Sequence, residues 1–425
     1  MNWGKLITLW FILVAMLMWS GSVPGFIQAK HTEQFVPQLG PFIRIWDDAG
    51  DNINPSVAYN PIHDEYLVVW VTKQGEFSWD IWGQRLRGDG SLVPNGWFNI
   101  DNVAGLHLVD PDVAYNPHMD QYLVVYTAEI TFNDHDIWGK LVNWNGELST
   151  RLIIDDRPEK QADPAVVYNN QERQYLVAYS DWQASGLLNV YLQTLGENGS
   201  GIYNAVIESG SGEYRGFPDV AYDAEYNRYL IVYGNEGPYL PRIIGKTFSA
   251  DLSSFSPEFH YNDDNVLGYE AQISCGLNDC LVVWSGGFHG YVKARRVSHD
   301  GTPLGPTGGF EIAGLITDVI QGRPSVSIFN PWGYLVTWNY FVTTTADNGD
   351  VYGRVVGYGK DKPIGIRFPI DNRQFYEGYS SLACDLTGSC LLVDSHNPLE
   401  YPAGDYEISG RLVYTQRVFL PLTIR

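Results

Sequence analysis

An internal repeat of about fifty residues dominates the sequence and occurs seven times. Its first copy runs from Pro55 to Asp101 and reads PSVAYNPIHDEYLVVW, then, after a loop, DIWGQRLRGDGSLVPNGWFNID. Each copy contains a leucine that opens an apolar run, and successive leucines are separated by 56, 53, 54, 51, 54 and 56 residues: Leu67, Leu123, Leu176, Leu230, Leu281, Leu335 and Leu391. A near-constant period of short β-rich runs is typical of the blades of a β-propeller.

Each copy contains patterns for four strands. The PSVAYN run starts with proline, which is tolerated at the first residue of a strand, and the YLVVW run is rich in β-branched and aromatic residues. DIWGQRL supplies a third strand, and an Asp-Gly or Asn-Gly pair then marks the turn into a fourth in several copies. No helical period is present. We therefore predict an all-β chain, a seven-bladed β-propeller of four-stranded antiparallel blades.

The last copy lacks a fourth strand of its own. Its third strand ends near Tyr414 with no glycine-containing turn after it, which would leave an unpaired edge. Pro41–Asp47 (PFIRIWD) resembles the fourth-strand segment Gly96–Asp101 (GWFNID) but precedes the first copy. We predict that this N-terminal strand closes the ring, so that the propeller spans residues 41–415. Residues 416–425 then form a C-terminal tail, because Pro421 and the missing turn argue against a fourth strand there.

Residues 1–29 have the pattern of a signal peptide. Lys5 provides a positive charge, and the uncharged run Leu6–Trp19 suits the apolar region of a signal peptide but is short for a membrane span. An uncleaved anchor is the alternative. We expect a protein that is secreted, extracellular or in the cell envelope, without a membrane span once the leader is removed.

The four cysteines form two pairs that bracket the turn between first and second strands. Cys275 with Cys280 and Cys384 with Cys390 stand where other copies have two tyrosines, such as Tyr59 and Tyr66. No histidine has the spacing of a zinc site. We predict two cross-strand disulfides, which fit an oxidising compartment.

A formal net charge of −22 bears on the partners. Because a charge of this sign repels phosphate backbones, we expect no nucleic acid as a partner. We expect a monomer whose partner is an extracellular glycan or protein.

The loops between second and third strands differ most between copies, and they carry aromatic and histidine side chains beside carboxylates. In a sugar-binding surface, ring faces stack on C–H groups while acceptors bind hydroxyls. The alternative is that these loops vary because little constrains them. The candidate ligand-binding residues are Trp79, Phe132, His135, Trp182, Tyr239, Phe288, His289, Tyr340 and Tyr401.

No pattern for catalysis stands out. The GxSxG, HExxH and phosphate-loop motifs are absent, and acids are so numerous that some pair of carboxylates can always be found. Acids that open the third strand recur between copies, so we interpret them as serving the blade: Asp80, Asp136, Asp350 and Glu407. We predict no catalytic residues, no metal site and no cofactor.

The motifs PxVAYNPxxxxYLVVW, DIWGQRL and a terminal FxID resemble repeats of uncharacterised secreted bacterial β-propeller proteins. The resemblance implies a secreted propeller without an assigned activity. We therefore favour non-catalytic binding of a glycan or protein on the face of the variable loops. Two alternatives stay open: an extracellular glycosidase or lyase with carboxylates near the axial opening, and a structural component of the cell envelope.

Overall fold

The computed structural model describes residues 37–48, 50–75, 78–209, 213–236, 241–262, 268–287, 290–343, 349–373, 377–398 and 405–415. Every regular element within these ranges is a β-strand, and no helix there could cross a membrane. The predicted signal peptide (residues 1–29) and the tail (residues 416–425) lie outside the described residues.

The first sixteen strands after β1 form antiparallel groups of four, each ordered in space as in sequence. They are β2 (Asp51–Asn60), β3 (Glu65–Lys73), β4 (Trp79–Arg87) and β5 (Leu92–Asp101); β6 (His107–Asn116), β7 (Gln121–Thr131), β8 (Asp134–Asn143) and β9 (Leu152–Asp155); β10 (Gln161–Asn169), β11 (Gln174–Trp182), β12 (Leu188–Gly196) and β13 (Gly201–Ile207); and β14 (Tyr214–Asp223), β15 (Arg228–Glu236), β16 (Arg242–Ser249) and β17 (Phe259–His260). One parallel residue pair joins β4 to β6, and another joins β12 to β14.

The remaining strands continue the pattern, and the last group takes its fourth strand from the N-terminal end. They are β18 (Gly268–Cys275), β19 (Cys280–Gly286), β20 (Tyr291–Val297) and β21 (Phe310–Ala313); β22 (Val319–Phe329), β23 (Gly333–Val342), β24 (Gly349–Gly357) and β25 (Pro363–Asp371); and β26 (Glu377–Cys384), β27 (Ser389–His396), β28 (Glu407–Thr415) and β1 (Pro37–Trp46).

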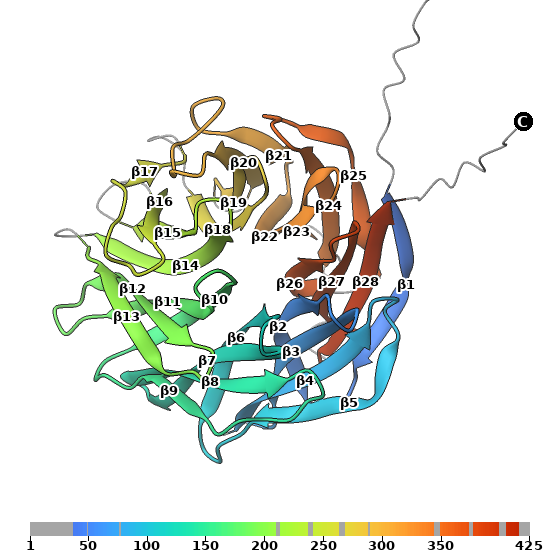
Figure 1. Cartoon of the computed structure of the whole chain (residues 1–425). Helices are drawn as coiled ribbons and strands as arrows, with labels where there is room; N and C mark the ends of the chain where they lie inside the picture. The colour runs from blue at the N-terminus through green and yellow to red at the C-terminus, as the bar shows by residue number, and fades with distance from the viewer. Residues whose placement is uncertain are drawn as a thin grey trace, which may run out of the picture. The chain divides into compact units, whose positions relative to one another are not determined.

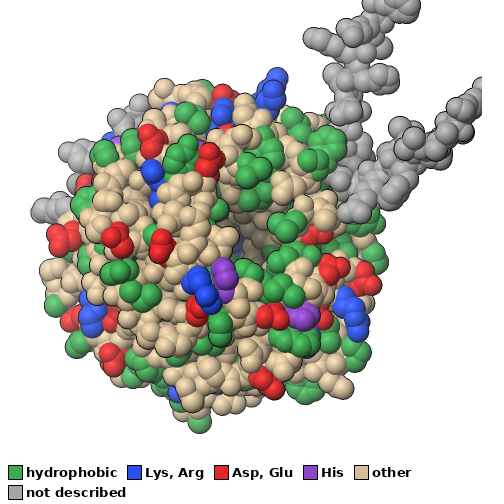
Figure 2. All heavy atoms as spheres, viewed as in Figure 1, with side chains coloured by type: hydrophobic (Ala, Val, Ile, Leu, Met, Phe, Trp, Pro, Cys, Tyr) green, Lys and Arg blue, Asp and Glu red, His purple; other side chains and the backbone are tan. Residues whose placement is uncertain are grey.

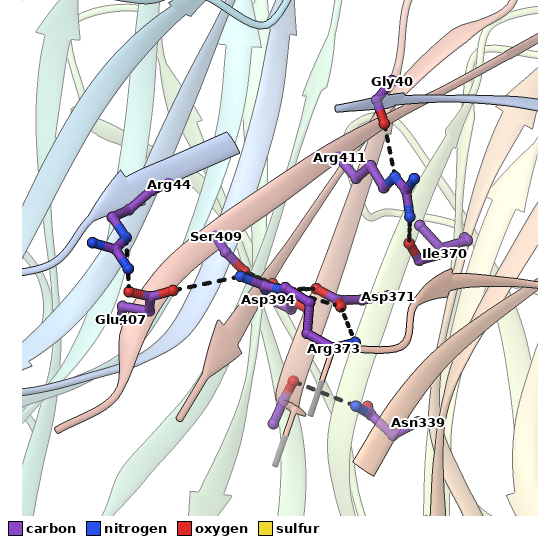
Figure 3. A network of polar contacts seen from close by, with 11 residues as sticks. Gly40, Arg44, Asn339, Ile370, Asp371, Arg373, Asp394, Glu407, Ser409 and Arg411 are labelled. Carbon is purple, nitrogen blue, oxygen red and sulfur yellow. Dashed lines mark hydrogen bonds and ion pairs between the residues drawn. The ribbon is translucent and has the colours of Figure 1, made fainter. Parts of the chain in front are cut away.

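β1 pairs antiparallel with β28, from Pro37 opposite Thr415 to Trp46 opposite Ile408. The strand begins four residues before the predicted start at Pro41, because residues 37–39 also pair with β28. Arg411 of β28 donates hydrogen bonds to the backbone oxygens of Gly40 in β1 and Ile370 in β25, both 2.8 Å long (Figure 3). The first and last described strands therefore share one sheet.

The inner strand of each group contacts the inner strand of the next group: β2, β6, β10, β14, β18, β22 and β26 follow one another, and β26 also contacts β2. The groups lie around a central opening (Figure 1). This arrangement is a β-propeller. The core lies between neighbouring groups, where buried side chains such as Val69 and Ile81 of one group pack with Val113 and Tyr126 of the next.

The asparagine that ends the AYN motif closes the turn after the inner strand. Asn60 Oδ1 accepts hydrogen bonds from the backbone N–H groups of Ile62 and His63, at 2.8 and 3.2 Å. Asn116 and Asn169 make the same pair of contacts in their groups. The recurrence of this residue therefore reflects turn geometry.

The aspartate that ends the FxID motif joins neighbouring groups. Asp101 at the end of β5 accepts a hydrogen bond from the hydroxyl of Tyr126 in β7 and another, 2.7 Å long, from Arg151 Nη2. Asp155 at the end of β9 accepts one from Tyr179 in β11 at 2.8 Å. The buried carboxylate thus links the outer strand of one group to a central strand of the next.

Both predicted disulfides are confirmed: Cys275 is bonded to Cys280 and Cys384 to Cys390. Each bond joins directly opposite residues of an inner hairpin. In the first group the same places hold Tyr59 and Tyr66, whose ring centroids are 5.0 Å apart. The two kinds of pair thus tie the same two strands together.

Candidate functional site

The inner strands bulge where they approach the central axis. Between Ile53 and Ser56, β2 contains one residue more than its partner β3, and matching irregularities occur in the other inner strands. The bulged residue is in the left-handed region, with φ values of 53° at Asn54, 51° at Asp110 and 54° at Asp163. Asparagine and aspartate tolerate this conformation better than most residues, which accounts for them before the proline.

Three consecutive residues of every inner strand line a central cavity of about 350 Å³, from residues 54–56 of β2 to residues 379–381 of β26. The lining is strongly acidic, and Arg323 is its one basic residue among those that the structure describes. Figure 2 shows a face hollowed near its centre, with histidine and cationic side chains beside the hollow. The carboxylates in the lining are Asp110, Asp112, Asp163, Asp219 and Glu270.

Several of these carboxylates tie neighbouring inner strands together. Asp112 accepts hydrogen bonds of 2.8 Å from the hydroxyl of Ser56 in β2 and from the backbone N–H of Val166 in β10. Asp219 accepts one of 2.7 Å from the backbone N–H of Ile273 in β18. These two side chains satisfy backbone groups and hold the assembly together.

Burial keeps two carboxyls of the lining close to half-protonated at neutral pH. Burial, with repulsion from Asp110, raises the pKa of Asp163 to about 7. Burial likewise raises the pKa of Asp219 to about 7, and Asp112 adds to the shift. A carboxyl with such a pKa can either donate or accept a proton near pH 7.

A second hollow, of about 260 Å³, continues the central cavity outward. It shares Asp110, Asp163 and Phe217 with the cavity and adds Glu129, His135, Lys160 and Trp182. A third hollow, of about 610 Å³, shares Glu129, His135 and Lys160 with the second and extends to His107 and Phe132. We call these two outer hollows the radial groove.

Charged and aromatic groups alternate at the outer end of the radial groove. Phe132 is 84% exposed, and Lys160 Nζ lies 4.5 Å from the centroid of its ring. His107 Nδ1 lies 3.1 Å from Glu129 Oε2, and its ring stacks on Trp79 with centroids 4.3 Å apart. The groove therefore offers an open aromatic ring with polar groups of both signs beside it.

His135 lies between the two hollows of the groove. Burial lowers its pKa and Lys160 lowers it further, although Glu129 opposes the shift. The imidazole is accordingly neutral at pH 7 and can both donate and accept a hydrogen bond.

The structure brings three of the predicted ligand-binding residues, Phe132, His135 and Trp182, to one groove. Trp79 reaches the groove through its stacking on His107. Tyr340 lies elsewhere and packs on Tyr352, with centroids 5.0 Å apart. The other four candidates lie outside the described residues: Tyr239, Phe288, His289 and Tyr401. Ligand binding by any of them stays a prediction.

The sequence did not single out Asp110, Asp163 or Lys160 as residues of the site. Asp110 and Asp163 each precede a proline, a pattern that predicts the start of a strand; that prediction is wrong, because both pairs lie at bulges inside β6 and β10. Their spacing of 53 residues was the available signal, because residues one repeat apart on inner strands meet at the axis. Glu129 is one of the carboxylates that the variable loops carry beside their aromatic residues, whereas no pattern singles out Lys160.

Two of the acids that open the third strands contact residues of their own group of strands. Asp136 is buried and accepts a hydrogen bond of 3.0 Å from Trp138 Nε1. Glu407 pairs with Arg44 of β1 at 3.1 Å. Among the residues that the structure describes, no three His, Cys, Asp or Glu side chains are grouped to hold a metal ion.

No family model and no curated protein matches the sequence. Solved structures that match include the GH93 α-L-arabinofuranosidase of Fusarium graminearum with arabinobiose, at 14% identity over 88% of this chain and 98% of that chain, with a TM-score of 0.49. The α-L-arabinanase of Penicillium chrysogenum with arabinobiose is 13% identical over 88% and 98%, with a TM-score of 0.49. The Dos1 propeller is 11% identical over 88% and 95%, with a TM-score of 0.48. At such identities these likenesses assign no activity to this chain.

Proposed function

We propose that the protein binds an extracellular glycan or protein, without catalysis, in the radial groove on the face of the variable loops. The observation that carries the proposal is the convergence of Phe132, His135 and Trp182 on one groove that opens into the central cavity. Phe132 lies in the loop between β7 and β8, His135 near the start of β8 and Trp182 at the end of β11, about fifty residues further along the chain.

The chemistry of the groove suits a sugar. An exposed ring such as Phe132 can stack on the C–H face of a pyranose, while Glu129 and Lys160 beside it accept and donate hydrogen bonds to hydroxyls. Concave sites with an apolar platform and a few placed polar groups are typical ligand sites.

A glycan array combined with a hydrolysis screen tests this proposal. We expect retention of a glycan without turnover, and at least about tenfold weaker binding by Phe132→Ala and Trp182→Ala, because central aromatic anchors dominate binding energy. Phe255→Ala is the matched control: Phe255 is also exposed and has Lys246 Nζ 4.2 Å from its centroid, but it lies in the loop before β17. Equal losses in all three variants would contradict the proposal.

The alternative function is an extracellular glycosidase or lyase with carboxylates at the axial opening. The central cavity favours it, because Asp163 and Asp219 have pKa values of about 7 and line one cavity. Of the two, Asp163 also lines the radial groove. If the screen finds hydrolysis, we expect Asp163→Asn to lower the rate at least about 100-fold. If Asp163→Asn hydrolysed the glycan as fast as the wild type, Asp163 would have no role in catalysis.

We also propose that the seven groups are the blades of one ring that β1 closes. The pairing of β1 with β28 and the contact of β26 with β2 support this reading. Deletion of residues 31–47 should lower the melting temperature by more than about 10 °C, since it removes a whole strand and exposes an edge. Deletion of residues 31–36 is the control, and equal melting temperatures for both deletions would refute closure.

We propose, finally, that the protein is exported as a monomer after removal of residues 1–29, in keeping with its resemblance to secreted bacterial repeat propellers. The two disulfides support an oxidising compartment. Intact-mass measurement of the exported protein under non-reducing conditions should show a processed N-terminus and no free thiol. A protein recovered with the leader still attached would count against this proposal.

A further inference from the structure

The inner hairpin turns lie at the opposite ends of the strands from the radial groove, and five consecutive groups present an apolar residue there. The most exposed are Leu277 at 78% and Leu386 at 72%. We call this set the apolar arc; in spatial order its members are Leu277, Pro331, Leu386, Ile62 and Met119. The other two groups have Gln171 and Glu172 in one turn, and Tyr226, which packs on His299, in the other.

The two most exposed members of the arc are held rigidly. Leu277 lies in the turn closed by Cys275 and Cys280, and Leu386 lies in the turn closed by Cys384 and Cys390. Asp385 further orders the second turn by accepting hydrogen bonds from the backbone N–H groups of Thr387 and Ser389. A turn whose backbone is already constrained loses less conformational entropy when it is covered, so these turns suit a docking surface.

The last described strand, β28, ends beside the turn that carries Leu386, the middle member of the apolar arc. Tyr414, next to the last residue of β28, pairs with Ser389, which follows the turn that carries Leu386. The group of β26 to β28 has Ile62 and Met119 on one side and Pro331 and Leu277 on the other. Ten residues span at most about 36 Å when extended, and adjacent strands are about 4.8 Å apart. Residues 416–425 are therefore long enough to reach Leu386, in the turn that leads into the strand paired with β28.

The composition of the tail matches this surface. Val418, Leu420, Leu422 and Ile424 alternate along the tail, so an extended chain would present them on one side. Pro421 is compatible with an extended backbone that needs no donor at that position.

The charges match as well. Arg417 lies close to the start of the tail. Asp64 and Asp385 stand in the same turns as Ile62 and Leu386, and these turns belong to neighbouring groups. A cation at the start of the tail would meet this acidic pair.

We propose that residues 416–425 bind to the apolar arc of their own propeller as an extended segment. The docked tail covers Leu386 and its neighbours, so that the face opposite the radial groove is closed to other partners. This role is independent of the ligand in the groove.

Limited proteolysis of the exported full-length protein tests the docking. Trypsin cleaves after Arg417, and intact mass reports the loss of residues 418–425. We expect Leu386→Asp to be cleaved there at least about tenfold faster than the wild type, because cleavage tracks the undocked population. Ile366→Asp is the matched control: it makes the same change at a residue of β25 that is 78% exposed and lies outside the arc.

Hydrogen exchange on the wild type provides a second readout that does not depend on a variant. Docked amides of residues 418–424 should exchange at least about tenfold more slowly than those of the same segment as a free peptide. Unprotected amides, or equal cleavage rates in Leu386→Asp and the wild type, would overturn the proposal. Two further assays of Leu386→Asp would then identify another occupant of the arc. Loss of self-association would indicate a second copy of the chain, and loss of flotation with phosphatidylcholine vesicles would indicate a lipid surface.

Discussion

Two joints between neighbouring groups use the same terminal aspartate in different ways. At the joint between the groups of β2 and β6, Asp101 receives hydrogen bonds from Tyr126 and Arg151. At the joint between the groups of β22 and β26, Asp371 binds Arg373 and faces Asp394 (Figure 3). Tyr126 and Asp394 occupy equivalent places, three residues after the anchor leucines of their copies.

The exchange of tyrosine for aspartate reverses the electrostatics of the joint. Burial alone would raise the pKa of Asp101, but hydrogen bonds from Arg151 and Tyr126 outweigh it and lower the pKa. Burial raises the pKa of Asp394, and repulsion by Asp371 adds to the shift while Arg373 opposes it. A hydroxyl donates a hydrogen bond to a buried carboxylate without adding charge. A second carboxyl adds an acidic group, so the two carboxyls need a shared guanidinium to offset their repulsion.

The largest contrast should come from the two arginines. Arg373 lies 2.6 Å from Asp371 and 3.9 Å from Asp394, and Arg373→Ala would leave these two buried carboxyls without the guanidinium that they share, while Glu407 keeps Arg44. We expect a loss of about 3–5 kcal/mol in the free energy of unfolding. Arg151→Ala should cost clearly less, because Tyr126 and Lys140 still face Asp101. Denaturant titration measures both, and equal losses would show that the joints do not differ in this way.

The next largest change in unfolding free energy concerns Tyr126, the tyrosine of the first joint. Tyr126→Phe removes its hydrogen bond to Asp101 and should cost about 1.5–3 kcal/mol, the range for bonds to charged groups. Tyr66→Phe is the control, because the hydroxyl of Tyr66 is buried without a hydrogen-bond partner within the described residues. If both substitutions changed the unfolding free energy equally, the hydroxyl of Tyr126 would have no special role.

The smallest effect concerns pH. Because the pKa of Asp394 is raised on folding, the folded state binds the proton more tightly, and the stability contributed by this group is lost as pH rises from about 4 through the folded pKa. Asp101 behaves oppositely, since its pKa is lowered on folding, and its contribution is lost as pH falls.

Asp394→Asn removes the first of these dependences. The variant should be more stable than the wild type by about 1 kcal/mol at pH 8, where the wild-type carboxyl is held against its tendency to ionise, and should gain less at pH 5. Chemical denaturation at the two pH values measures the difference. Parallel stability profiles of variant and wild type would mean that Asp394 does not set the pH response of this joint.

Much of the fold was predictable from local patterns. Three patterns depend on residues close in sequence: the apolar run around Leu67, the Asn-Pro turn after Tyr59 and the paired cysteines. The structure contains the strands, the turn and the disulfides expected from them. The variable loops pointed to Phe132 and His135, which do reach one groove, but equally to Tyr340, which does not. Loop composition alone could not separate them, because grouping depends on where each loop lies around the axis.

The sequence by itself determined the repeat, the strands within each copy and the residues that tie each hairpin, because those features rest on alternation, turn chemistry and pairing across a few residues. Only the tertiary structure decided what the recurring aspartates do. Asp110 and Asp163 meet in the cavity because a left-handed bulge occurs in each inner strand and the strands then converge on one axis. Asp101 and Asp371 acquire their partners only when neighbouring groups pack, and whether a hydroxyl or a second carboxyl faces them sets the charge of the joint.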